Sequence, residues 1–131
     1  MNDAATTVAQ LRQRVAEFVD RRDWHQFHTP KNLATSLAIE AAELMEHFQW
    51  LTPEQSRAVA GQPERLAAVA AELADVLAYL LAMANVLGLD LAAAFEAKMA
   101  ANERKYPADQ YRGRFGPDDP SPPETAAPTG P

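Results

Sequence analysis

The chain has 131 residues, of which 47% are hydrophobic and 23% are charged, and its formal net charge at pH 7 is -6. These values fit one domain with an apolar core, and the acidic excess argues against a nucleic-acid partner, whose phosphates require a basic surface. The chain has no cysteine, which excludes disulfides and thiolate metal sites, so any metal must be bound by oxygen or imidazole ligands.

Two features predict where the protein resides. Residues 1–10 lack a basic segment followed by an apolar run, so we expect no signal peptide. The most apolar stretch, residues 66–89, is interrupted by Glu72, Asp75 and Asn85, which favours a buried helix over a membrane span. We therefore expect a soluble, cytoplasmic protein with no membrane partner.

Helical periodicity begins near the N-terminus. Apolar residues recur at helical spacing over residues 7–22, which predicts an amphipathic helix. Residues 21–28 break this period and predict a loop. Thr29-Pro30 then provides a cap residue followed by proline at the first helical position, so a second helix is expected from Pro30 to about Gln49.

Further start and stop signals follow. They predict a short helix opened by Thr52 and ended by Gly61, a long helix from Pro63 to Leu87, and a last helix from Leu91 to about Lys105. No strand-like alternation is present, so the predicted fold class is all-α, a four-helix-type antiparallel bundle. Leu73, Leu77 and Leu81 widen the apolar stripe of the long helix, which predicts an oligomer whose second subunit covers part of it.

The C-terminal segment differs in composition. Residues 113–131 contain six of the ten prolines and few residues that could form a core. We expect residues 1–112 to form the domain and residues 113–131 to form a disordered, proline-rich tail.

Two acidic doublets, Glu40-x-x-Glu43 and Glu72-x-x-Asp75, lie within the two long helices. Residues three apart share a helix face, and each doublet borders an apolar stripe. Four carboxylates in this setting repel each other and lose solvation unless a cation joins them. Their hard oxygen atoms suit Mg²⁺, with Mn²⁺ as the possible substitute.

A ferritin-like di-iron centre is the obvious alternative, but it requires Glu-x-x-His on its helices. The corresponding positions here hold Glu46 and Ala78, so that centre is excluded. An isolated E-x-x-E on a helix can also be a simple solvated face.

Several other residues have both a structural and a functional interpretation. His25 and His28 are either loop caps or substrate contacts, and His47 is either an outer hydrogen-bond partner of the carboxylates or a surface group. Trp24 and Trp50 flank the second helix and are either core edge or a stacking surface for a flat base.

Lys98, Asn102 and Lys105 form a line along the last helix. Such a line is commonly solvated, but in an acidic chain it is also the best source of donors to a metal-held phosphate.

The combined motifs resemble a known family. Arg22-Asp23-Trp24-His25-Gln26-Phe27-His28-Thr29-Pro30-Lys31-Asn32-Leu33, Phe48-Gln49-Trp50 and Lys98-x-x-x-Asn102-x-x-x-Tyr106-Pro107 resemble the MazG-like all-α nucleoside triphosphate pyrophosphohydrolases, and within them the dCTP pyrophosphatase group. The resemblance spans roughly Leu11 to Pro107. The longer MazG pattern has a glutamate directly before its first ligand, where this chain has Ile39, and that difference favours the dCTP pyrophosphatase group.

The resemblance implies a Mg²⁺-dependent enzyme that converts dCTP, or a modified dCTP, to dCMP and pyrophosphate. It implies that Mg²⁺ binds Glu40, Glu43, Glu72 and Asp75, that Lys98 and Asn102 contact phosphates, and that Trp24, His28, Trp50 and Tyr79 shape the base pocket. Glu40 or Glu43 would activate water, Lys98 would stabilise developing charge, and the chain would form a homotetramer. A broad-specificity or dUTP-directed enzyme, or a non-catalytic nucleotide-binding helical module, remains the alternative.

Overall fold

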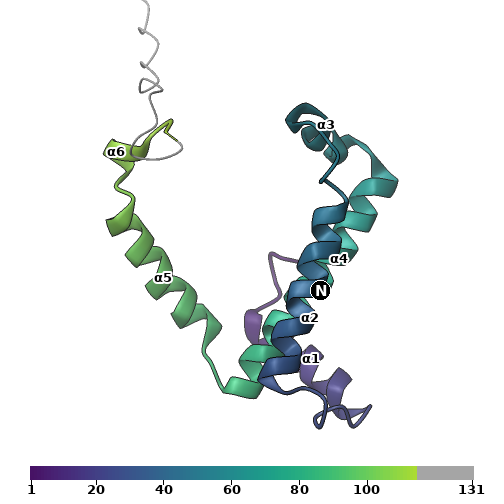
Figure 1. Cartoon of the computed structure of the whole chain (residues 1–131). Coiled ribbons are helices and arrows are strands. Elements are labelled where there is room, and N and C mark those ends of the chain that lie inside the picture. The colour runs from purple at the N-terminus through teal and green to yellow at the C-terminus, as the bar shows by residue number, and fades with distance from the viewer. Residues whose placement is uncertain (115–131) are drawn as a thin grey trace, which may run out of the picture. The chain divides into compact units, whose positions relative to one another are not determined.

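The computed structural model describes residues 1–114, and within that part every regular element is a helix. In chain order the elements are α1 (Val8–Asp20), α2 (Pro30–Glu46), α3 (Pro53–Ala58), the 3-10 helix η1 (Val59–Gly61), α4 (Pro63–Leu87), α5 (Leu91–Lys105) and α6 (Ala108–Tyr111) (Figure 1). The predicted all-α class is confirmed. The part of the predicted tail beyond residue 114 lies outside the described residues.

The chain divides into two compact units, Met1–Asp90 and Leu91–Pro131. The first contains α1 to α4, and the second contains α5 and α6. Within the second unit, the rings of Tyr106 and Tyr111 meet edge to face with centroids 5.3 Å apart. The expected single domain over residues 1–112 stays a prediction.

Threonine caps set the start of several helices in the first unit. The backbone N–H of Gln10 donates to the Thr7 hydroxyl at 3.2 Å, and the Thr7 N–H donates to the Gln10 side chain at 2.8 Å. Thr52 and Gln55 form the same reciprocal pair at 3.2 and 2.9 Å. These capping boxes satisfy N–H groups that a helix start leaves without partners, so α1 and α3 begin within one residue of the predicted starts.

The ends of the two long helices follow different rules. Gly88 adopts a left-handed conformation with φ of 63°, which ends α4 at Leu87 as predicted. By contrast, α2 ends at Glu46, three residues before the predicted end at Gln49. The N–H groups of Phe48 and Gln49 both donate to the Met45 carbonyl, at 2.9 and 3.0 Å, so the chain forms a tight turn there.

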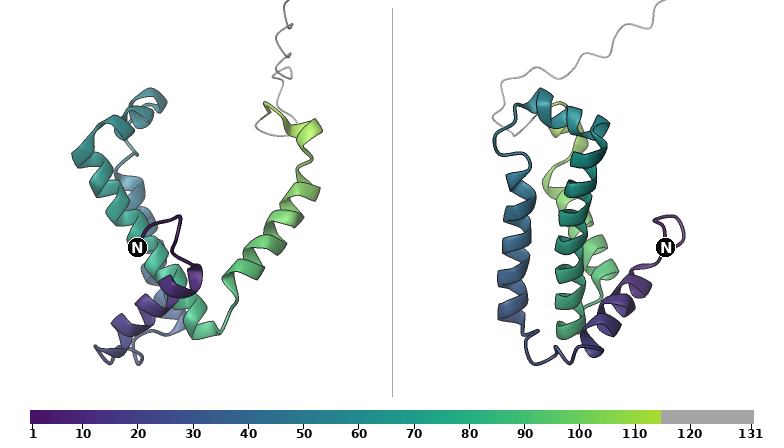
Figure 2. Two further views of the ribbon diagram at one scale, coloured as in Figure 1. Left: turned by 180° about the vertical axis from the view of Figure 1, so that it is seen from behind. Right: turned by 90° about the vertical axis from the view of Figure 1, so that its right-hand side faces the viewer.

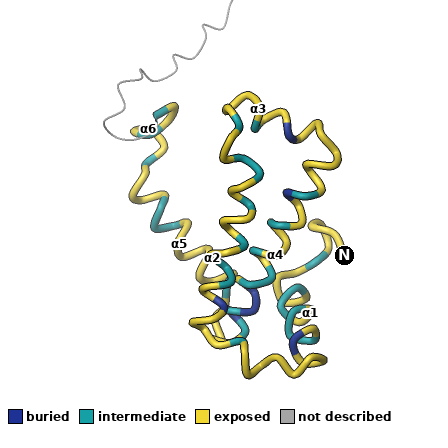
Figure 3. The backbone as a smooth tube through the Cα atoms, turned by 45° about the vertical axis from the view of Figure 1, so that its right-hand side comes forward, coloured by how far each residue is buried: buried dark blue, intermediate teal, exposed yellow. Residues whose placement is uncertain are grey.

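The core of the first unit lies mainly between α2 and α4, which run antiparallel side by side (Figure 2). Its buried apolar residues are Val19, Leu33, Val59, Val69, Leu81, Ala82 and Ala84. Much of the described chain is exposed or half-buried (Figure 3). Leu73 and Leu77 on α4 are 52% and 43% exposed, whereas Leu81, predicted to widen the same outward stripe, is buried within this chain.

The length and apolar composition of α4 would allow it to cross a membrane, a property that core helices of water-soluble proteins share. Its middle contains Glu72 and Asp75, which are costly to place in lipid.

A polar contact fixes α1 against the end of α4. The Arg12 guanidinium donates to the Asn85 side chain at 2.9 Å and to the carbonyls of Leu89 and Ala84 at 2.7 and 3.2 Å. The Asn85 amide donates back to the Arg12 carbonyl at 3.0 Å. Both residues are half-buried, so removing one partner leaves polar groups that water only partly satisfies.

Replacing Asn85 with alanine should therefore lower the free energy of unfolding by roughly 1–3 kcal/mol. Urea denaturation measures the change. Gln13→Ala is the control because it removes an exposed hydrogen bond within α1, from Gln13 to Glu17, and it should change stability by less than about 0.5 kcal/mol. Equal effects of the two substitutions would contradict the assigned role of Asn85.

Candidate active site

Three of the predicted metal ligands meet between α2 and α4. Carboxylate oxygens of Glu40, Glu43 and Glu72 all lie within 4.8 Å of one another. The three-residue spacing places the first two on one face of α2, and the antiparallel packing brings the third opposite them. We call these three residues the acidic cluster.

Charge and burial combine at Glu40. Its pKa is raised above the ordinary value, first by desolvation and then by the charges of Glu43, Asp75 and Glu72. A raised pKa means that ionisation of Glu40 costs free energy in the folded protein, which is expected where carboxylates converge. The cluster therefore has the donor chemistry and the charge to hold a divalent cation such as Mg²⁺.

Asp75, the fourth predicted ligand, lies three residues after Glu72 on α4. It does not share the close grouping of the acidic cluster, but its charge contributes to the raised pKa of Glu40. Its side chain also lines a neighbouring pocket. Asp75 thus connects the acidic cluster to that pocket, and its coordination of a metal stays a prediction.

His47 contacts the opposite helix. Its Nε2 atom lies 3.8 Å from Glu72 Oε1, and both side chains are about three-quarters buried, with 26% and 22% exposure. The sequence predicted either an outer hydrogen-bond partner of the carboxylates or a surface group, and the structure places His47 beside Glu72. This contact with a carboxylate of the acidic cluster supports the interpretation of His47 as an outer hydrogen-bond partner of the carboxylates predicted to bind metal.

The neighbouring pocket, here called the aromatic pocket, has a volume of about 400 Å³ and lies between α1, the loop before α2, and α4. Its lining includes Arg14, Val15, Phe18, Val19, Trp24, His28, Asp75, Ala78, Tyr79 and Ala82. This volume is typical of small-molecule sites. Three of the four residues predicted to bind the base, Trp24, His28 and Tyr79, line it together.

Packed rings form one wall of the aromatic pocket. Phe18 and Trp24 meet edge to face at 5.7 Å, and the Trp24 and His28 rings lie 6.4 Å apart. The Arg22 guanidinium covers the Phe18 ring at 3.6 Å. Burial, and then the charge of His25, lower the pKa of His28, so its imidazole is neutral at pH 7.

The other three residues predicted to contact the nucleotide do not line the aromatic pocket. One follows α2, and two belong to the second unit. Trp50 follows the far end of α2, is 87% exposed and is not among the residues lining the aromatic pocket. Lys98 and Asn102 lie on α5 in the second unit. Contact of these three residues with a nucleotide stays a prediction.

The sequence interpretation missed Arg14 and Phe18 as pocket residues. Phe18 belongs to the predicted apolar stripe of the first helix. Such a stripe predicts packing in the core and does not indicate contact with a ligand. Arg14 carried no signal, because its contribution depends on the angle at which α1 meets α4.

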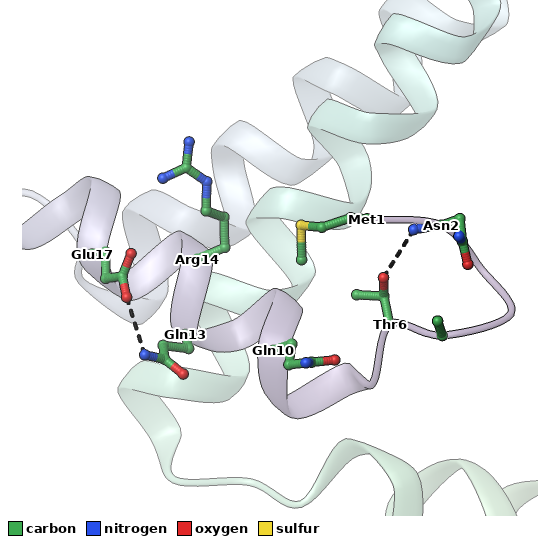
Figure 4. A pocket seen from close by; sticks show the side chains of 8 residues that line it. Met1, Asn2, Thr6, Gln10, Gln13, Arg14 and Glu17 are labelled. Atoms are coloured by element: carbon green, nitrogen blue, oxygen red, sulfur yellow. Dashed lines mark hydrogen bonds between the residues drawn. The ribbon is translucent and has the colours of Figure 1, made fainter.

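A separate hollow of about 450 Å³ lies beside the N-terminal segment (Figure 4). The Asn2 N–H donates to the Thr6 hydroxyl at 3.0 Å and the Gln13 amide donates to Glu17 at 3.0 Å along its walls. It lacks the converging carboxylates and packed rings of the site described above, so we assign it no chemistry.

Comparison with known proteins places this site in context. Residues 35–114 match the model of the MazG-like family. The chain is 43% identical over 107 residues to dCTP pyrophosphatase 1 of Bos taurus, covering 82% of this chain and 63% of that protein. It is 44% identical over 106 residues to dCTP pyrophosphatase 1 of Homo sapiens, covering 81% of this chain and 62% of that protein.

The chain thus spans less than two thirds of the length of these curated relatives. A crystal structure of a pyrophosphatase from Archaeoglobus fulgidus superposes with a TM-score of 0.69 at 39% sequence identity, covering 82% of this chain and 98% of that one. With the family match over residues 35–114, these likenesses agree with the helical fold. The chain belongs to the MazG-like family.

Proposed function

We propose that this protein is a Mg²⁺-dependent nucleoside triphosphate pyrophosphohydrolase that acts on dCTP or a modified dCTP. The observation that carries the proposal is the acidic cluster joined through Asp75 to the aromatic pocket within one unit. The acidic cluster suits phosphates held by a metal ion, and the aromatic pocket suits a flat base. The 43% identity to a dCTP pyrophosphatase supports the choice of substrate.

The metal would be held by Glu40, Glu43 and Glu72, with Asp75 as the fourth ligand. When bound, Mg²⁺ would offset the charge of the triphosphate, polarise a phosphoryl oxygen and lower the pKa of a water. This choice of ion rests on the all-carboxylate donor set and on the unfavourable charge recorded by the raised pKa of Glu40.

The residues of the chain have separable roles in the proposed reaction. Glu40 or Glu43 orients the attacking water toward the linkage between the α and β phosphates. Trp24 and Tyr79 hold the base and sugar in the aromatic pocket. The products are a nucleoside monophosphate and pyrophosphate, a reaction suited to clearing the nucleotide pool in the cytoplasm.

Several finer features are proposed from the sequence pattern. Lys98 and Asn102 contact the phosphates, with Lys98 stabilising developing charge, and Trp50 contributes to the base site. An antiparallel four-helix arrangement and a homotetramer are proposed as well. The exposed Leu73, Leu77 and Leu80 on α4, at 52%, 43% and 41%, support association because such a surface is unfavourable in water.

The first prediction from this proposal concerns the reaction products. Purified protein incubated with dCTP, dUTP and dATP should release pyrophosphate in the presence of Mg²⁺, fastest from dCTP, and none after chelation. Release of orthophosphate, or hydrolysis without a divalent ion, would reject the proposed chemistry. Equal rates on all three nucleotides would indicate a broad-specificity enzyme, and preferred hydrolysis of dUTP would reject the substrate.

The second prediction tests whether a carboxylate of the acidic cluster matters more for catalysis than an ordinary exposed glutamate. Glu43→Gln should lower kcat by on the order of 100-fold or more, because it removes an oxygen that binds metal or orients water. Glu46→Gln is the matched control, since Glu46 is exposed on the same helix and lies outside the cluster. If both variants keep wild-type kcat, the cluster is not catalytic.

The third prediction tests metal binding without turnover. Glu72→Ala should fold, with metal-free stability equal to or above wild type because carboxylate repulsion is relieved. Mg²⁺ at about 100 times its Kd should stabilise the wild type by about 2.7 kcal/mol but not the variant. Thermal and urea unfolding measure both effects, and a large loss of metal-free stability would show a structural role instead.

The fourth prediction follows from the raised pKa of Glu40. Because the folded state binds this proton more tightly than the unfolded state, metal-free stability falls as pH rises from the ordinary value of 4.5 through the raised pKa. Glu40→Gln should therefore be more stable than wild type at pH 7, with the difference shrinking towards pH 4.5. A difference independent of pH across this window would contradict the electrostatic account.

A further inference from the structure

Arg14 differs from neighbouring arginines in having no hydrogen-bond or ion-pair partner among the residues that the structure describes. Arg12 donates to Asn85, and Arg22 donates to the Phe18 carbonyl at 3.1 Å. Arg21 pairs with Glu17 at 3.5 Å. Among residues 1–114, no hydrogen bond or ion pair engages the Arg14 guanidinium, although Arg14 lines the aromatic pocket.

Arg14 lies on the wall of two cavities. It lines the aromatic pocket and also the N-terminal hollow, which Gln10 and Gln13 line as well (Figure 4). Asp75 lines the same aromatic pocket from α4, yet no ion pair within 4.0 Å joins it to Arg14. The cation is therefore available to a ligand in the pocket.

The chemistry of a guanidinium restricts what it can recognise. It offers several donors in a planar fork and no acceptor. Cytosine presents two adjacent acceptors, O2 and N3, to such a fork. Uracil and thymine carry a proton on N3, so the same approach would place a donor against a donor.

The imidazole of His28 adds a second contact that fits cytosine. The ring of His28 also lines the aromatic pocket, and none of its nitrogens has a hydrogen-bond partner among residues 1–114. Because burial and His25 lower its pKa, the imidazole is neutral at pH 7 and has a free acceptor. Such an acceptor suits the exocyclic amino group of cytosine.

We propose that Arg14 is a specificity-determining residue that donates to O2 and N3 of cytosine in the aromatic pocket and thereby rejects uracil and thymine. This inference rests on the proposed function of the same pocket. A guanidinium can also bind O6 and N7 of guanine. The free His28 acceptor favours cytosine, because that edge of guanine offers no amino donor beside those two acceptors.

The test compares Arg14→Gln with Arg65→Gln, an exposed arginine near the start of α4 that is outside the aromatic pocket. The measured quantity is the ratio of kcat/KM for dCTP to that for dUTP, with dGTP as a third substrate. Arg14→Gln should lower the dCTP-to-dUTP ratio by about tenfold or more, since a bidentate base contact is lost. Arg65→Gln should leave the ratio unchanged.

Two kinetic outcomes would overturn the inference while leaving the proposed function intact. An equal loss on every nucleotide would show that Arg14 contacts phosphate or sugar and not the base. A selective loss on dGTP would show that it reads guanine.

A binding measurement separates this inference from the hydrolytic proposal. Calorimetry with dCMP and dUMP should show that the wild type prefers dCMP and that Arg14→Gln loses most of this preference. If the wild type shows this preference but hydrolyses nothing, the enzymatic proposal fails and the Arg14 inference stands. If the wild type binds neither nucleotide, or binds both equally, the Arg14 inference fails whatever the hydrolysis result.

Discussion

The antiparallel packing of α2 against α4 is the constraint on which the rest of the structure depends. Apolar residues such as Leu33 and Val69 drive the two helices together, because burying them removes apolar surface from water. The same packing brings Glu40 and Glu43 opposite Glu72, although like charges oppose close approach. The apolar contacts thus hold an electrostatically unfavourable arrangement in place, and a bound cation would convert that cost into affinity.

Much of this could be predicted from sequence because the signals are local. A threonine cap, a proline at the first helical position and Gly88 each act within a few residues, so most helix boundaries were recoverable. The acidic doublets were equally visible, since a spacing of three fixes a shared face. The early end of α2 was missed because two N–H groups converge on the Met45 carbonyl, a turn that the side-chain pattern does not encode.

The unpredictable parts are those that depend on relations between helices. The pairing of His47 with Glu72 depends on the register between α2 and α4, and the place of Arg14 depends on the angle of α1. Leu81 shows the same limit, since periodicity placed it with Leu73 and Leu77 but the fold buries it. Periodicity gives the face of a residue on its own helix, but it does not say which residue the next helix places opposite.

The loop between α1 and α2 has a consequence for how a ligand would be received. Its backbone is tied at both ends, by the Trp24 N–H to the Val19 carbonyl at 3.2 Å and by the Asn32 amide to the Phe27 carbonyl at 3.0 Å. Trp24 is further held against Phe18. A wall fixed in this way before binding loses little conformational entropy when a flat ring arrives, so more of the contact energy becomes affinity. Preorganisation of this loop is thus a property that the short, irregular segment contributes and the long helices do not.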